Sequence, residues 1–234
     1  MSKTYVLVHG AWHGGWCWRR VADLLTARGH RVFAPTLSGV ADRSHLDPAG
    51  IDLSTHAADV ANLIRWEGLT EVVLVGHSYG GMVVSQAVEA IPPGVVSSIV
   101  FLDAFLPADG MSLLDYTAVE GREGGPMVEE GEATGRVSPI TAEMFGVNPA
   151  DRAYVDAQCT PQPYRTLTEK ARLTGAREAI PRKTYILATG WAPAFAAFAT
   201  QVKDDPAWRY LETPAGHDVM LDAPHWLAET LEAA

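Results

Sequence analysis

Residues 72–81 read VVLVGHSYGG, and this stretch decides the fold. The apolar run that opens it predicts a buried β-strand, and the amphipathic stretch 79–90 predicts a helix directly after the strand. Between them lies the pattern G-x-S-x-G, which holds Ser78 on a tight strand-to-helix turn and lifts its hydroxyl above the sheet. Gly76 and Gly80 suit this turn because a Cβ at either position would collide with neighbouring backbone. The pattern predicts a nucleophile elbow with Ser78 as the nucleophile; the alternative is a glycine-rich turn with a bystander serine.

Short apolar runs alternate with amphipathic stretches on both sides of the elbow. The predicted strands are 5–8, 31–34, 71–75, 97–102, 184–188 and 208–212. The predicted helices are 16–28, 54–66 with Ser54 as its N-cap, 79–90, 192–203 and 223–233. This alternation implies right-handed crossovers and therefore an α/β fold with a mostly parallel, doubly wound sheet.

The alternation stops in the middle of the chain, where residues 107–181 contain many glycines, prolines and charged residues. This segment is too long for a loop in a compact domain. We therefore predict a core formed by residues 1–106 and 182–234, and a mainly helical cap inserted at 107–181. Short helices are expected in the cap at 141–145 and 149–157.

The composition excludes several classes of function. The chain has 234 residues, 47% of them hydrophobic, so it can bury a large core. Its formal charge of −10 opposes binding to nucleic acid or anionic lipid, and no apolar run is long enough to span a membrane. The residues before the first strand predict no secretory signal, and the two cysteines lack metal-ligand spacing. We expect a cytoplasmic protein that binds a small molecule and no metal; its oligomeric state stays open, with a homodimer as one alternative.

The loop after the first strand, residues 8–16, reads VHGAWHGGW. Loops at the carboxyl ends of neighbouring parallel strands meet in one crevice. The backbone N–H groups of Ala11 and Tyr79 can therefore point at the same place and form an oxyanion hole. The alternative is that the glycines only permit a tight turn. Trp12 and His13 are predicted to line the substrate pocket, with packing against the first helix as the alternative.

The best candidate for a general base lies near the C-terminus, where PAGHD occupies residues 214–218. His217 sits on a short loop between the last strand and the last helix, which is where a histidine can reach Ser78. A histidine has an ordinary pKa of about 6.5, so it can accept a proton at neutral pH.

Four segments together resemble the α/β-hydrolase branch that contains plant methylesterases, hydroxynitrile lyases, small bacterial esterases and amide or carbamate hydrolases. They are YVLVHGAWHGGWCWRRV, VVLVGHSYGGM, IVFLDAFLPADG and AGHDVMLDAP, and with their spacing they cover essentially the whole chain. The resemblance implies a Ser-His-acid catalytic triad, main-chain oxyanion donors at Ala11 and Tyr79, no cofactor, and a cap over an apolar pocket.

The sequence departs from the family at the triad acid. The family usually carries an aspartate in the loop that here reads TGWAP at 189–193, without a carboxylate. Asp103 is the best replacement, because it ends the strand predicted next to the nucleophile strand. A buried carboxylate there would hold the tautomer of His217. The alternatives are Asp218, directly after His217, and a Ser-His dyad without an acid.

The resemblance implies hydrolysis of a carboxylic ester, or of a related acyl compound such as a carbamate or amide, through an acyl-enzyme. Cyanohydrin cleavage is disfavoured, because the lyases of this branch carry threonine and lysine where this chain has Ala11 and Asp218. A non-catalytic binder of small molecules is the third alternative. The predicted pocket residues, which are mostly apolar or aromatic, favour a neutral, hydrophobic substrate of small to medium size. They are Trp12, His13, Phe105, Leu106 and Trp191.

Overall fold

The structure is a computed structural model and describes residues 2–117, 125–191 and 195–234. Its centre is a six-stranded, all-parallel sheet in the order β2-β1-β3-β4-β7-β8. The strands are β1 (Thr4–Val8), β2 (Arg31–Phe33), β3 (Val72–His77), β4 (Val96–Leu102), β7 (Arg182–Ala188) and β8 (Trp208–Thr213). All six predicted strands are present, and the predicted α/β fold with a mostly parallel sheet is confirmed.

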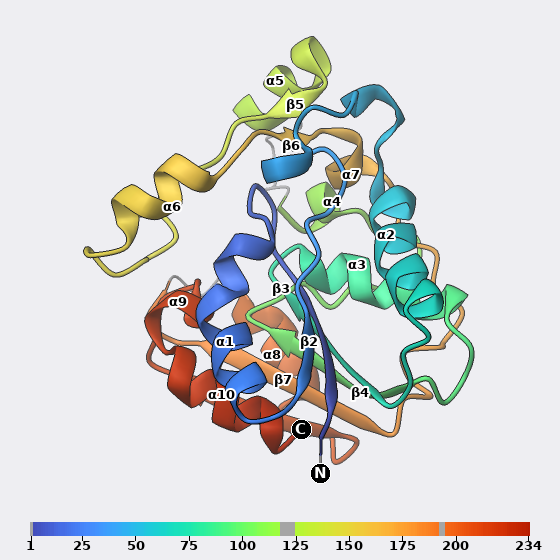
Figure 1. Ribbon diagram of the computed structural model, residues 1–234. Coiled ribbons are helices and arrows are strands. Elements are labelled where there is room, and N and C mark those ends of the chain that lie inside the picture. The colour runs from blue at the N-terminus through green and yellow to red at the C-terminus, as the bar shows by residue number, and fades with distance from the viewer. Residues whose placement is uncertain (1, 118–124, 192–194) are drawn as a thin grey trace.

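The central strands are mostly apolar because both faces of the sheet are covered. Every residue of β3 is buried, and so are nearly all residues of β1 and β4. The helices α1 (Arg19–Ala27) and α10 (Pro224–Glu232) pack together on one side of the sheet, and α2 (Leu53–Trp66) and α3 (Gly80–Ala87) lie on the other (Figure 1). The helix α8 (Ala196–Val202) follows β7, and the short α9 (Val219–Asp222) precedes α10.

Three local predictions need correction. The N-cap of α2 is Asp52, whose carboxylate accepts the N–H of Thr55 in a capping box, whereas Ser54 bonds to Glu169. The helix predicted at 141–145 is wrong, because these residues form turns. The helix predicted at 192–203 is shorter where it is described: α8 starts at Ala196, and residues 192–194 lie outside the described residues.

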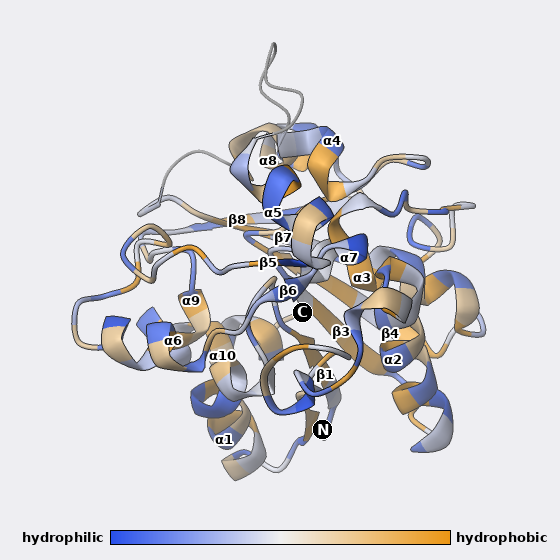
Figure 2. Ribbon diagram, turned by 90° about the horizontal axis from the view of Figure 1, so that it is seen from above, coloured by the Kyte–Doolittle hydropathy of each residue, from blue (hydrophilic) through white to orange (hydrophobic). Residues whose placement is uncertain are grey.

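The segment between β4 and β7 lies over the carboxyl ends of the strands (Figures 1 and 2). It contains α4 (Leu113–Thr117), α5 (Pro126–Thr134), α6 (Arg152–Gln158) and α7 (Arg165–Thr168), and a two-stranded antiparallel pair, β5 (Arg136–Val137) with β6 (Gln162–Pro163). The indole N–H of Trp12 in the core donates to the carbonyl of Val137 at 2.9 Å. This segment therefore covers the end of the sheet at which parallel-sheet proteins bind ligands. The domain boundaries at 107 and 181 stay a prediction.

Within the described residues, every helix is too short or too polar to cross a lipid bilayer.

We expect Leu74→Ala to lower the free energy of unfolding by about 2–5 kcal/mol, measured by urea denaturation. Leu74 is fully buried at the centre of β3, between Val6 of β1 and Ile99 of β4, and the truncation leaves a cavity there. Trp66→Ala is the control, because Trp66 is 77% exposed and its loss should change this free energy by about 0.5 kcal/mol or less. Equal effects of the two substitutions would contradict the assignment of the core.

Candidate active site

Ser78 lies on a strained turn between β3 and α3. Its φ of 53° is in the left-handed region, which is costly for a residue with a side chain. The N–H of Ser78 donates to the carbonyl of Leu102 in β4 at 3.2 Å, and the turn itself is closed by the N–H of Gly81, which donates to the carbonyl of Ser78 at 3.0 Å. A Cβ on Gly76 would lie 2.6 Å from the carbonyl oxygen of Gly80, and one on Gly80 would lie 2.8 Å from that of His9. The steric requirement predicted for both glycines is therefore confirmed.

His217 and Asp103 form a buried hydrogen-bonded pair. The Nδ1 of His217 lies 2.6 Å from the Oδ2 of Asp103, and each residue is 1% exposed. Asp103 directly follows β4, and its N–H donates to the carbonyl of Ile186 in β7. Its second carboxylate oxygen, Oδ1, accepts the N–H of Ala188 at 3.1 Å. Because β4 lies between β3 and β7, the ends of these strands bring the carboxylate beside the loop of His217.

The loop of His217 is tied to the nucleophile elbow through His77. The Nε2 of His77 lies 3.0 Å from the carbonyl oxygen of His217, and the two rings are 4.5 Å apart between centroids. Among the hydrogen bonds of the described residues, none joins Ser78 Oγ directly to His217. Catalytic hydrogen bonds are often long in the absence of substrate, so the arrangement is compatible with transfer of a proton from Ser78 to His217.

Two buried histidines that flank the site are neutral. Burial lowers the pKa of His9 to about 3 and holds the pKa of His77 well below its ordinary value. The Nε2 of His9 accepts the N–H of Leu37, so its proton sits on Nδ1 and is donated to the carbonyl of Gly10. That carbonyl shares a peptide plane with the N–H of Ala11, and His9 therefore fixes the direction of this N–H.

The two predicted oxyanion donors remain available. Within the described part of the chain, no hydrogen bond uses the N–H of Ala11 or of Tyr79 as its donor. Tyr79 follows Ser78 at the start of α3, where the helix end favours negative charge. The assignment of Ala11 and Tyr79 as an oxyanion hole stays a prediction.

Aromatic rings surround His217. The ring centroids of Trp191, Phe195 and Phe145 lie 4.3, 5.3 and 5.6 Å from that of His217. Phe105 packs against Phe195 at 5.0 Å, and its N–H donates to the carbonyl of Ser78. This aromatic cluster, Phe105, Phe145, Trp191 and Phe195, makes the surroundings of His217 apolar. The sequence predicts helices over both Phe145 and Phe195, and nothing in a helical pattern indicates contact with the distant His217.

The other predicted pocket residues differ in their placement. Trp12 and Leu106 are 9% and 7% exposed, and their contact with substrate stays a prediction, as it does for Phe105 and Trp191. His13 needs correction, since it is 1% exposed and both ring nitrogens are engaged within the protein. Its partner is the carboxylate of Asp218, whereas the partner of His217 Nδ1 is the carboxylate of Asp103. The sequence reasoning missed this pair.

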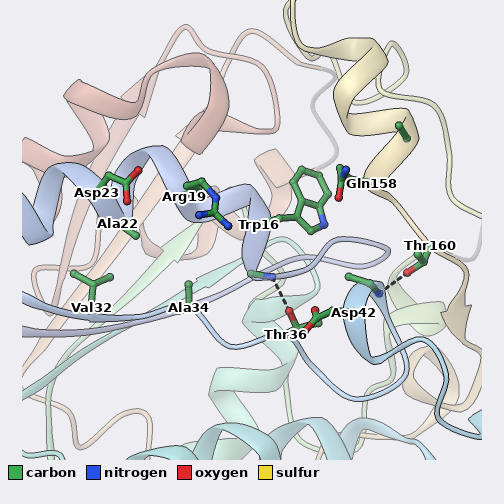
Figure 3. Close-up of a pocket in the computed structure, with 13 residues that line it drawn as sticks. Trp16, Arg19, Ala22, Asp23, Val32, Ala34, Thr36, Asp42, Gln158 and Thr160 are labelled. Carbon is green, nitrogen blue, oxygen red and sulfur yellow. Dashed lines mark hydrogen bonds between the residues drawn. The ribbon is translucent and has the colours of Figure 1, made fainter.

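The surface of the protein also contains a cleft of about 650 Å³. Its walls, made of described residues, include Trp16, Arg19, Asp42 and Gln158 (Figure 3). Ser78, Asp103 and His217 do not line it. Trp16 separates this cleft from His13, because the indole of Trp16 stacks on the ring of His13 at 5.2 Å between centroids.

Comparison with known proteins gives matches over the whole chain. Residues 5–230 match the alpha/beta hydrolase family. A carbendazim-hydrolysing esterase of Nocardioides sp. (strain SG-4G) is 42% identical over 98% of both chains. Methylesterase 1 of Arabidopsis thaliana is 40% identical over 117 residues, which cover 45% of this chain and 41% of that protein. An extracellular alpha/beta-hydrolase from a Paenibacillus species shares the fold with a TM-score of 0.84 and 24% identity, over 99% of this chain and 98% of that one.

We expect Gly10→Ala to slow the reaction of Ser78 with a fluorophosphonate probe by at least about tenfold. A Cβ at residue 10 would lie 2.8 Å from the Cβ of Ser78 and 3.0 Å from the Nδ1 of His77, so it must displace the elbow. The labelling rate is measured on protein whose folding is checked by circular dichroism. Gly50→Ala is the matched control, because a Cβ there meets no atom within 4 Å and should leave the rate unchanged. An unchanged rate in Gly10→Ala would contradict the tight approach of this loop to Ser78.

Proposed function

The chain belongs to the alpha/beta hydrolase family, and from this premise we propose that it hydrolyses esters and carbamates with a catalytic triad of Ser78, His217 and Asp103. It is a carboxylic ester hydrolase, as its similarity to the Nocardioides esterase over nearly the whole length of both chains indicates. The observation that carries the proposed triad is the 2.6 Å contact between buried Nδ1 of His217 and Oδ2 of Asp103, beside the strained elbow of Ser78.

The proposed reaction proceeds in two halves. The Oγ of Ser78 attacks the carbonyl carbon of the substrate while its proton moves to the Nε2 of His217. The N–H groups of Ala11 and Tyr79 donate to the resulting oxyanion, a contribution of about 3–4 kcal/mol for each such donor. His217 then gives its proton to the leaving alcohol as the C–O bond breaks. Water then attacks the acyl carbon while His217 takes its proton, and the bond between the acyl carbon and Ser78 Oγ breaks as His217 returns that proton to Oγ, which releases the acid and free Ser78.

In this mechanism Asp103 acts only through its hydrogen bond to His217. Its Oδ2 accepts the Nδ1–H of His217, which leaves Nε2 unprotonated and able to accept the proton of Ser78. When that proton arrives, the carboxylate stabilises the imidazolium. Because its other oxygen is held by the N–H of Ala188, the carboxylate cannot rotate freely, and the ring orientation is fixed with it.

The aromatic cluster favours a neutral substrate with a flat or apolar group on one side of the carbonyl. The Nocardioides relative is named for the hydrolysis of carbendazim. We propose that this chain accepts carbendazim and other neutral aryl esters and carbamates. A cyanohydrin substrate is disfavoured, since Asp218 is buried and paired with His13 and provides no positive charge for a leaving cyanide.

We expect Ser78→Ala to lower hydrolysis of p-nitrophenyl butyrate and of carbendazim by at least about a thousandfold without unfolding the protein. The hydroxyl is the only protein group in the proposed mechanism that forms a covalent bond to the substrate. Product release is followed by absorbance and by chromatography. Ser97→Ala, at the start of β4 and remote from the elbow, should keep turnover within about twofold. Retained activity in the Ser78 variant would overturn the proposed nucleophile.

We expect Asp103→Asn to lower kcat by about two to four orders of magnitude, by analogy with other serine triads. An amide in this position donates as well as accepts and can favour the wrong tautomer of His217. The measurement is steady-state kinetics with the same two substrates, and Asp204→Asn is the control because Asp204 is exposed. Near-normal kcat in Asp103→Asn would favour a Ser-His dyad instead.

A further inference from the structure

A second buried histidine–carboxylate pair lies beside the proposed triad. The Nε2 of His13 is 3.0 Å from the Oδ2 of Asp218, and the two residues are 1% and 0% exposed. His13 belongs to the loop after β1, two residues beyond Ala11. Asp218 directly follows His217 in the loop between β8 and α9. The proposed mechanism uses neither side chain.

The partners of His13 indicate that this pair is an ion pair. Its Nδ1 faces the carbonyl oxygen of Ala11 at 2.8 Å, and a carbonyl can only accept a hydrogen bond. Its Nε2 faces a carboxylate, so both nitrogens have acceptors and the ring is best satisfied as an imidazolium. Burial opposes this charge, but the charge and hydrogen bond of Asp218 outweigh it and raise the pKa of His13. In the same way the pKa of Asp218 is lowered against burial by His13.

The pair joins two parts of the proposed catalytic apparatus. Through Ala11 the imidazolium holds the loop that carries one proposed oxyanion donor, and through Asp218 it holds the loop that carries the base. The loop of His217 is also connected to the elbow of Ser78, through the hydrogen bond between His77 and the carbonyl of His217. The hydrogen bonds of His13 connect it to the oxyanion loop, which is the loop of Ala11, so the three loops form one connected unit.

We propose that His13 and Asp218 are positioning residues, whose ion pair sets the distance between His217 and the oxyanion loop and neutralises the negative charge of Asp218 beside the base. This inference rests on the proposed function. A buried carboxylate next to His217, without its counter-ion, would favour the protonated imidazole, which cannot accept the proton of Ser78. The pair therefore affects both the geometry and the protonation of the base.

The surroundings of the pair are closed and contain few other charges. The rings of Trp16 and Phe145 cover His13, with centroids 5.2 and 5.5 Å away. Trp16 also forms a wall of the cleft in Figure 3, so it separates the ion pair from the open space of that cleft. The titratable groups that face the pair or lie near it are His9, Cys17, His77, Asp103, Cys159 and His217.

The test compares His13→Gln, Asp218→Asn and the double variant with the wild type, using p-nitrophenyl butyrate. For His13→Gln we expect kcat to fall by at least about tenfold, with KM changed by less than about threefold, because proximity and orientation are lost and binding is not. The acid limb of the pH–rate profile should move upwards by about one pH unit. Asp218→Asn is nearly isosteric and keeps the inference testable if His13→Gln does not fold.

The double variant separates the ion pair from its individual members. It removes both charges together, so its acid limb should return towards that of the wild type, and its loss in kcat should be smaller than the product of the two single losses. Purely additive losses with an unmoved acid limb would overturn the proposal. So would wild-type kinetics in His13→Gln.

His30→Gln is the matched control. His30 pairs with Glu232 at 2.9 Å and lies just before β2, at the end of the sheet opposite the site. We expect the kcat of His30→Gln to stay within about twofold of the wild type and its pH profile to be unchanged. A loss of kcat equal to that of His13→Gln would mean that a histidine–carboxylate pair affects activity only through the stability of the protein. Turnover that persists in Ser78→Ala refutes the proposed function, whereas a dead Ser78→Ala with normal His13→Gln refutes this inference alone.

Discussion

The hydrogen bond between Asp103 and His217 depends on three separate parts of the chain. β4 supplies the carboxylate, β7 fixes it through the carbonyl of Ile186 and the N–H of Ala188, and the loop after β8 supplies the ring. A buried carboxylate is costly unless hydrogen bonds satisfy its oxygens, and here each oxygen has a partner. The strand order β3-β4-β7-β8 makes these partners neighbours. The parallel sheet is therefore the element that turns distant residues into one site.

The sequence predicted the sheet because its signal is local and repeated. Each strand is a short apolar run and each crossover an amphipathic stretch, so an error of one or two residues at an end does not change the topology. The N-cap of α2 illustrates the limit. Both Asp52 and Ser54 are residues that cap helices, and the reciprocal bond between Asp52 and Thr55 decides between them. Ser78 and Asp103 were predictable for a related reason, since both directly follow central strands.

The direction of a side chain within a loop was less predictable than the place of the loop. His13 was expected to face the substrate. Trp12, directly before it, has a φ of 65° that turns the chain, and His13 contacts Asp218 instead. These two residues are 205 positions apart, and no periodic pattern joins them. Phe145 and Phe195 escaped prediction for the same reason, because their contacts with His217 come from segments that only the tertiary structure brings together.

The position of the acid also bears on the choice of substrate. In the α/β-hydrolase branch that this chain resembles, the loop after β7 usually carries the carboxylate, whereas here it carries Trp191, 4.3 Å from the ring of His217. Because Asp103, which follows β4, contacts His217, the loop after β7 does not need to place a carboxylate beside His217. An aromatic ring can then take that space and offer its face to the imidazolium that forms in the proposed mechanism. The same ring makes the surroundings of the site apolar. The proposed stabilisation of the base and the proposed preference for hydrophobic substrates would thus both follow from the proposed place of the acid.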